Sequence, residues 1–137
     1  MPEGVGYGPQ NTASIGLDIH VIGNHAYALS GMFGASTSEQ TLLDFTSGNY
    51  YLVGRVTFTG SVKSTAPQSG SISAAVVSFN GIPIAILKND GLNEPGQYVS
   101  YSKIIIPPFT NVKVTVESAD TDSDNEGSAL ITGIIYK

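Results

Sequence analysis

The stretch that decides the fold is ISAAVVSF (residues 72–79), followed by NG (80–81) and IPIAIL (82–87). Two apolar runs flank a dipeptide whose residues both tolerate positive φ, as a type I′ turn requires. The pattern predicts a tight antiparallel hairpin with its turn at Asn80-Gly81. Because hairpins join neighbouring antiparallel strands, the stretch indicates a β fold without crossover helices.

Short apolar runs of the same kind recur along the rest of the chain. Alternation of period two is clear in Val112, Val114 and Val116, and no long stretch has the 3.6-residue period of a helix. The predicted strands cover residues 15–22, 25–33, 41–45, 49–59, 72–79, 82–87, 98–106, 111–118 and 128–136. We therefore predict an all-β fold, an antiparallel β-sandwich of about nine strands that is jelly-roll-like and occupies residues 15–137. Within it, the buried side of the first strand is predicted to consist of Ile15, Leu17, Ile19 and Val21.

An extended N-terminal arm, residues 1–14, is predicted to precede the sandwich. Its prolines, and its glycines at positions 4, 6 and 8, disfavour a regular ladder or helix. We expect the arm to attach the protein to a partner through Val5, Tyr7 and Pro9; the alternative is a tail with no role. The arm lacks the charge and the apolar run of a secretory signal, so we expect synthesis in the cytoplasm.

Several strands are apolar on both faces, although a sandwich buries only the inner face of each strand. In the last strand Ile131 and Ile135 share one face, and Ile134 and Tyr136 lie on the other. Only 12% of the residues are charged, against about a quarter in ordinary globular proteins. We therefore expect a homotrimer with Ile134 and Tyr136 in the subunit interface; the alternative is that loops cover these strands.

Composition excludes several other classes of partner and site. The net charge is −5 and basic residues form no cluster, so we expect no nucleic-acid partner. No apolar run approaches the ~20 residues of a membrane helix, so we expect no membrane partner. The chain has no Cys and therefore no disulfide or thiolate metal site. It also lacks a Gly-x-Ser-x-Gly motif, and we expect neither enzymatic activity nor a cofactor.

The two histidines, His20 and His25, are separated by an odd number of positions. In an extended chain this spacing places them on opposite faces, so we do not expect them to bind a metal ion together. A cupin-type site, which needs several His ligands and a carboxylate, is not predicted.

The acidic stretch DTDSDNEG (residues 120–127) offers Asp120, Asp122 and Asp124 as a weak calcium candidate, since calcium prefers several oxygen ligands at alternating positions. However, an EF-hand needs Gly at the sixth position and a bidentate Glu at the twelfth, where this chain has Asn125 and Ile131. A solvated hairpin tip is the preferred interpretation.

Four runs carry a resemblance to a known family: HAYALSG (25–31), LLDFTSGNYYLVG (42–54), IIIPPFT (104–110) and the terminal strand at 129–136. From about residue 20 onward the chain resembles the small all-β capsid decoration (cement) proteins of tailed bacteriophages, which sit as trimers on the outside of the shell. The trimeric domains of the tumour necrosis factor and complement C1q type share similar runs. The resemblance implies a jelly-roll-like trimer whose partner is the major capsid protein.

These observations lead to one expected function and one alternative. We expect a structural virion protein on the outer capsid surface, made in the host cytoplasm, whose trimer stabilises the shell. The absence of Lys and Arg before Arg55 fits an outer position, because an arm that neutralises packaged nucleic acid is basic. The alternative is a trimeric receptor- or glycan-binding tip of a head fibre or tail fibre.

Overall fold

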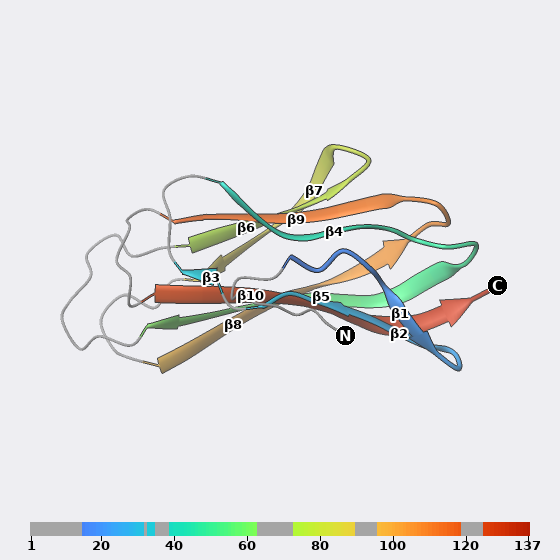
Figure 1. Cartoon of the computed structure of the whole chain (residues 1–137), viewed down its shortest axis with the longest axis horizontal. Helices are drawn as coiled ribbons and strands as arrows, with labels where there is room; N and C mark the ends of the chain where they lie inside the picture. Colours follow the sequence, from blue (N-terminus) through green and yellow to red (C-terminus); the bar gives the residue numbers. More distant parts are fainter. Residues whose placement is uncertain (1–14, 32, 35–38, 63–72, 90–95, 119–124) are drawn as a thin grey trace, which may run out of the picture.

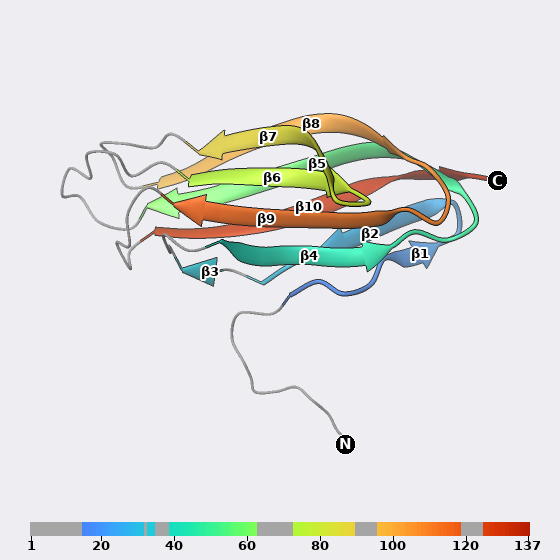
Figure 2. The ribbon, with the colours of Figure 1, turned by 90° about the horizontal axis from the view of Figure 1, so that it is seen from above.

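A computed structural model of the chain describes residues 15–31, 33–34, 39–62, 73–89, 96–118 and 125–137. In this part the chain forms ten strands and no helix. The strands build two antiparallel sheets that pack face to face (Figures 1 and 2). The predicted antiparallel β-sandwich is therefore confirmed. The predicted arm, with Val5, Tyr7 and Pro9, lies outside the described residues.

The order of the strands is that of a jelly roll. One sheet has the order β1 (His20–Ile22), β2 (His25–Leu29), β10 (Asn125–Tyr136), β5 (Tyr51–Val62) and β8 (Gly96–Ile106), with β3 (Phe33–Gly34) paired to the start of β10. The other has the order β4 (Gln40–Thr46), β9 (Asn111–Ser118), β6 (Ser73–Phe79) and β7 (Ile82–Asn89). Four strand pairs are nested in the sequence, as in a long hairpin rolled into two layers. They are β2 with β10, β4 with β9, β5 with β8, and β6 with β7.

The core lies between the two sheets and is made by alternate residues of each strand. The buried positions of β5, β9 and β10 include those that the alternation predicts: Leu52, Val56, Phe58, Val112, Val114, Val116, Ile131 and Ile135. Thr115, which alternation places on the outward side of β9, is buried as well. The turn between β6 and β7 is also as predicted, since Asn80 and Gly81 have φ values of 52° and 84°. Both values are positive, which a type I′ turn requires.

The prediction of a strand over residues 15–22 is wrong for most of its length. Only His20–Ile22 form a strand, and the backbone N–H and C=O of Gly16 bond instead to β4, each at 2.8 Å. Three of the four residues predicted to be buried are exposed, namely Ile15, Leu17 and Val21. Ile19 alone packs on the core. A side chain at Gly16 would collide with the Leu29 carbonyl oxygen, so glycine permits this close approach. We call residues 15–19 the edge segment, because they run beside β4 at one side of the sandwich (Figure 2).

The single strand predicted from His25 to Phe33 is instead divided into β2 and β3. Ser30 lies between them and is buried. Its backbone N–H donates to the Ala129 carbonyl oxygen at 3.0 Å, and its Oγ accepts the Ala129 N–H at 3.0 Å. The serine side chain thus takes the place of a ladder partner, and regular pairing of β2 ends there.

Candidate interaction surface

The outward side of the six-stranded sheet presents an exposed surface that we call the tyrosine face. It consists of the outward side chains of β1, β2, β10, β5 and β8, and it includes Tyr27, Tyr51, Tyr101 and Tyr136. The strand register arranges these side chains in rows that cross the sheet at right angles to the strands. Residues far apart in the sequence therefore become neighbours on one surface.

Two of these rows are mainly apolar. The first runs Ile22, His25, Ile134, Val53 and Ile105 across the five strands. The second runs Leu29, Leu130, Thr57 and Tyr101. At the ends of the first row Ile22 and Ile105 are 67% and 59% exposed, so the apolar character extends over the full width of the sheet. Contiguous exposed apolar surface of this kind marks an interaction site more often than a solvated face.

The two predicted interface residues, Ile134 and Tyr136, both lie on the tyrosine face. Ile134 is in the first apolar row, and Tyr136 is opposite Tyr51 at the end of the sheet. Both side chains point outward, whereas Ile131 and Ile135 on the same strand are buried. The sequence therefore assigned the outward side of β10 correctly, and the role of these residues in a subunit interface stays a prediction.

A polar row separates the two apolar rows: His20, Tyr27, Thr132, Arg55 and Lys103. The Arg55 guanidinium lies 5.1 Å from the centroid of the Tyr101 ring, within the range of a cation–π contact. The rings of His20 and Tyr27 are stacked, with centroids 5.1 Å apart. The alternation of side chains within one strand predicts that a residue of this row points outward. It does not reveal that Arg55 and Lys103, on different strands, are neighbours.

The expectation that the two histidines lie on opposite faces is wrong. The hairpin between β1 and β2 reverses the chain, and the stacking of His20 on Tyr27 places it on the same face as His25. His25 and Tyr27 are two positions apart on β2 and share one side of the sheet. Among the residues that the structure describes, no group of three or more His, Asp or Glu side chains could hold a metal ion.

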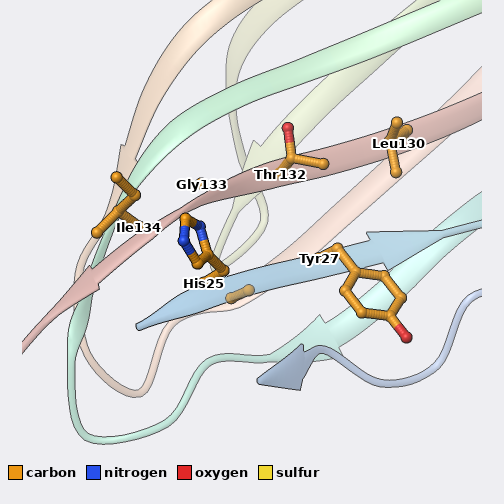
Figure 3. A pocket seen from close by; sticks show the side chains of 7 residues that line it. His25, Tyr27, Leu130, Thr132, Gly133 and Ile134 are labelled. Carbon is orange, nitrogen blue, oxygen red and sulfur yellow. The ribbon is translucent and has the colours of Figure 1, made fainter. Parts of the chain in front are cut away.

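A hollow of about 550 Å³ opens on the tyrosine face between β2 and β10 (Figure 3). It is lined by His25, Ala26, Tyr27, Leu130, Thr132, Gly133 and Ile134. Gly133 faces Gly54 on the paired strand, and a Cβ at Gly133 would lie 2.6 Å from the Val53 carbonyl oxygen. Glycine is thus required for the close approach of the two backbones beside the hollow. Its polar side-chain groups are the imidazole of His25 and the hydroxyls of Tyr27 and Thr132 (Figure 3).

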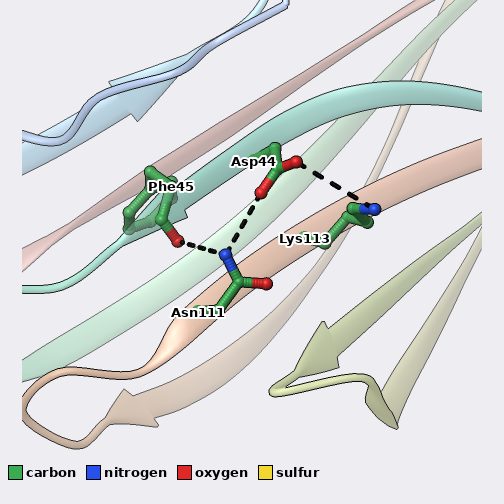
Figure 4. Close-up of polar contacts among 4 residues, drawn as sticks. All are labelled: Asp44, Phe45, Asn111 and Lys113. Carbon is green, nitrogen blue, oxygen red and sulfur yellow. Dashed lines mark hydrogen bonds and ion pairs between the residues drawn. The ribbon is translucent and has the colours of Figure 1, made fainter.

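The outward side of the four-stranded sheet is different in character. Near its β4 edge, Asn111 Nδ2 donates to Asp44 Oδ1 at 3.2 Å, and Lys113 Nζ lies 4.0 Å from Asp44 Oδ2 (Figure 4). At its other edge β7 exposes Ile82, Ile84 and Ile86. The apolar residues there form a single ridge on one strand, whereas those of the tyrosine face extend across a whole sheet.

The calcium candidates Asp120, Asp122 and Asp124 lie outside the described residues. Within the described ranges, the structure contains no helix long and apolar enough to cross a membrane. A comparison of the chain with protein-family models and with curated proteins finds no match.

Proposed function

We propose that the protein is a structural subunit that associates with copies of itself as a homotrimer and decorates the outer surface of a viral capsid. The observation that carries the proposal is the tyrosine face, whose two apolar rows cross five and four strands of the six-stranded sheet. A monomer would leave this surface in water. Association of subunits removes it from water, with a gain of about 25 cal/mol for each Å² of apolar area buried.

The surface chemistry supports a structural role on an outer shell. The chain carries few charges, and its net charge of −5 does not favour contact with packaged nucleic acid. The β7 ridge of Ile82, Ile84 and Ile86 lies on the opposite sheet, so it remains available when the tyrosine face is covered by other copies. A trimer with a second apolar surface can bridge neighbouring capsid subunits. Its contribution is mechanical, because the added contacts oppose the outward pressure of packaged DNA.

A receptor- or glycan-binding tip is the second candidate function, and the hollow on the tyrosine face favours it. Its volume of about 550 Å³ falls within the range of about 300–1,000 Å³ that is usual for small-molecule sites. Tyr27 offers an aromatic ring to a sugar, and Thr132 and His25 offer hydrogen bonds. Ile134 and Leu130 make much of the lining apolar, however, which suits a protein side chain better than a sugar.

The copy number in purified virus particles tests the proposal against the alternative. Quantitative mass spectrometry would measure the amount of this chain relative to the major coat protein. A decoration protein is expected in many copies, in a fixed ratio to the coat protein, whereas a fibre tip is expected in few. Either of two results would refute the proposed role. One is that the chain is absent from the particles, and the other is that the wild-type protein stays monomeric in light scattering at micromolar concentration.

A further inference from the structure

Arg55 and Lys103 form a cationic pair on the tyrosine face. They are directly opposite each other on β5 and β8, and both side chains are exposed. Like charges in this arrangement destabilise an antiparallel pair of strands. Among the described residues neither side chain forms an ion pair, and the stacking of Arg55 on Tyr101 restricts the orientation of the guanidinium. The pair is therefore available to an anionic group from outside the subunit.

The edge segment offers the complementary chemistry. Asp18 is exposed, and it forms no hydrogen bond or ion pair with any residue that the structure describes. Ile15 and Leu17 beside it are 44% and 64% exposed. The two hydrogen bonds of Gly16 to β4 fix the backbone of the segment at the side of the sandwich. An unpaired carboxylate and two exposed apolar side chains thus lie within four residues of one another on an anchored segment.

The remaining acids with described side chains are Glu39, Asp44 and Glu117, and they are less suitable for such a contact. Glu39 is exposed, but the described residues that follow it, Gln40 and Thr41, are polar. Asp44 already accepts a hydrogen bond from Asn111 and lies beside Lys113 (Figure 4). Glu117 projects from β9 on the outward side of the four-stranded sheet, without exposed large apolar neighbours on that strand. Asp18 is distinguished because its apolar neighbours match the apolar rows that border Arg55 and Lys103.

We propose that the tyrosine face of one copy binds the edge segment of the next copy, with the Asp18 carboxylate of the second copy contacting Arg55 and Lys103 of the first. Ile15 and Leu17 then pack against the apolar rows. The inference rests on the proposed self-association and specifies which surfaces meet. Both the charges and the apolar groups of the two surfaces are complementary, which fixes the register of an interface and excludes wrong partners.

The charge distribution also selects the symmetry of the contact. In a twofold contact the same patch is buried on both copies. None of the side chains that the structure describes on the tyrosine face is acidic. A twofold contact restricted to these side chains would desolvate Arg55 and Lys103 without a counter-charge, which is costly. A face-to-edge contact supplies one carboxylate to each cationic pair. Such heterologous contacts form a ring when the rotation between copies closes and an open filament when it does not, and a trimer is the smallest such ring.

Charge reversal tests this contact directly. Sedimentation equilibrium would be measured for the wild-type protein, Arg55→Glu, Asp18→Arg, the double variant and a mixture of the two single variants. We expect each single reversal to weaken association about tenfold or more, and increasing salt to weaken the wild-type contact. The double variant should recover the wild-type assembly. The mixture should form complexes that contain both proteins, which shows that the charges pair between copies and not within one.

The controls place similar changes on the opposite sheet. Glu117 and Lys113 are exposed there. The variants Glu117→Arg and Lys113→Glu should therefore leave the assembly unchanged. Circular dichroism melting of each variant distinguishes loss of folding from loss of the contact. If a charge reversal unfolds the protein, the milder single variants Arg55→Gln and Asp18→Asn replace it. Suppose that the wild-type protein is oligomeric, but that the single reversals do not weaken the oligomer, or that the double variant and the mixture do not restore it. The proposed contact is then wrong, whereas the proposed self-association stands. A monomeric wild-type protein would overturn both.

Discussion

Two buried serines join parts of the chain that are distant in the sequence. Ser47 lies at the end of β4, and its Oγ donates to the Pro107 carbonyl oxygen at 2.7 Å and accepts the Thr110 N–H at 2.9 Å. Ser30 contacts Ala129 in a similar way, as described above. In both places a side chain satisfies backbone groups that lie outside the strand ladders. Such groups are costly when they are buried without a partner.

Replacement of Ser47 by alanine is expected to destabilise the fold. The Pro107 carbonyl loses its donor, and the buried Thr110 N–H loses its acceptor, so we expect the free energy of unfolding to fall by about 1–3 kcal/mol. Urea denaturation of the two proteins measures the difference. Ser102→Ala is the matched control, because that hydroxyl donates only to the carbonyl of the next residue, at 3.3 Å, and is not buried. Equal unfolding midpoints for the two variants would contradict the role assigned to Ser47.

At the scale of single elements, β10 and β7 provide a matched pair of substitutions. Ile134 on β10 and Ile84 on β7 both point outward and are 36% and 46% exposed. Ile134→Asp is expected to dissociate the oligomer, because a carboxylate buried in an interface without a partner costs about 3–5 kcal/mol. Ile84→Asp is expected to leave the oligomer intact, because β7 belongs to the opposite sheet. Light scattering reports both molar masses, and an intact oligomer in Ile134→Asp would place the interface elsewhere.

The sequence predicts which side of a strand is buried, because side chains alternate with a period of two. Alternation places Leu52, Val56 and Phe58 on one side of β5, and all three are buried. Alternation does not show whether a segment belongs to a sheet. The edge segment alternates as well as a strand does, yet Gly16 bonds to β4 by a single isolated bridge and most of its apolar residues are exposed.

The register between distant strands was the part of the candidate surface that the sequence could not provide. Arg55 and Lys103 are opposite each other only because β5 pairs with β8, and the two β6–β7 hairpin strands lie between them in the chain. No local pattern encodes a pairing of that span, because it depends on how the whole sandwich closes. The same holds for the rows of the tyrosine face and for the hollow, each of which combines β2 with β10. What the sequence could supply was the outward position of Ile134 and Tyr136.

At the scale of the whole molecule, residues 1–14 are predicted to attach the protein to its partner. Deletion of residues 2–12 is expected to leave the oligomer size and the melting temperature nearly unchanged, because the sandwich begins after them. The same deletion should reduce the number of copies that remain on particles after washing, since fewer contacts to the shell are left. Light scattering, thermal melting and quantitative blotting of washed particles measure the three quantities. Retention equal to that of the full chain would assign attachment to the sandwich alone.

The position of β10 has a consequence for the kinetics of folding. This strand is the partner of β2, β3 and β5 and holds the six-stranded sheet together. Its register places Ile134 opposite His25, so most of the sandwich lies between the two partners in the chain. Pairings of such long span form slowly, because the entropy of closing the loop is lost before the contacts are gained. The joining of β2 to β10 is therefore expected to be a late step of refolding, and until it occurs the facing edges of these two strands are open to pairing with other chains.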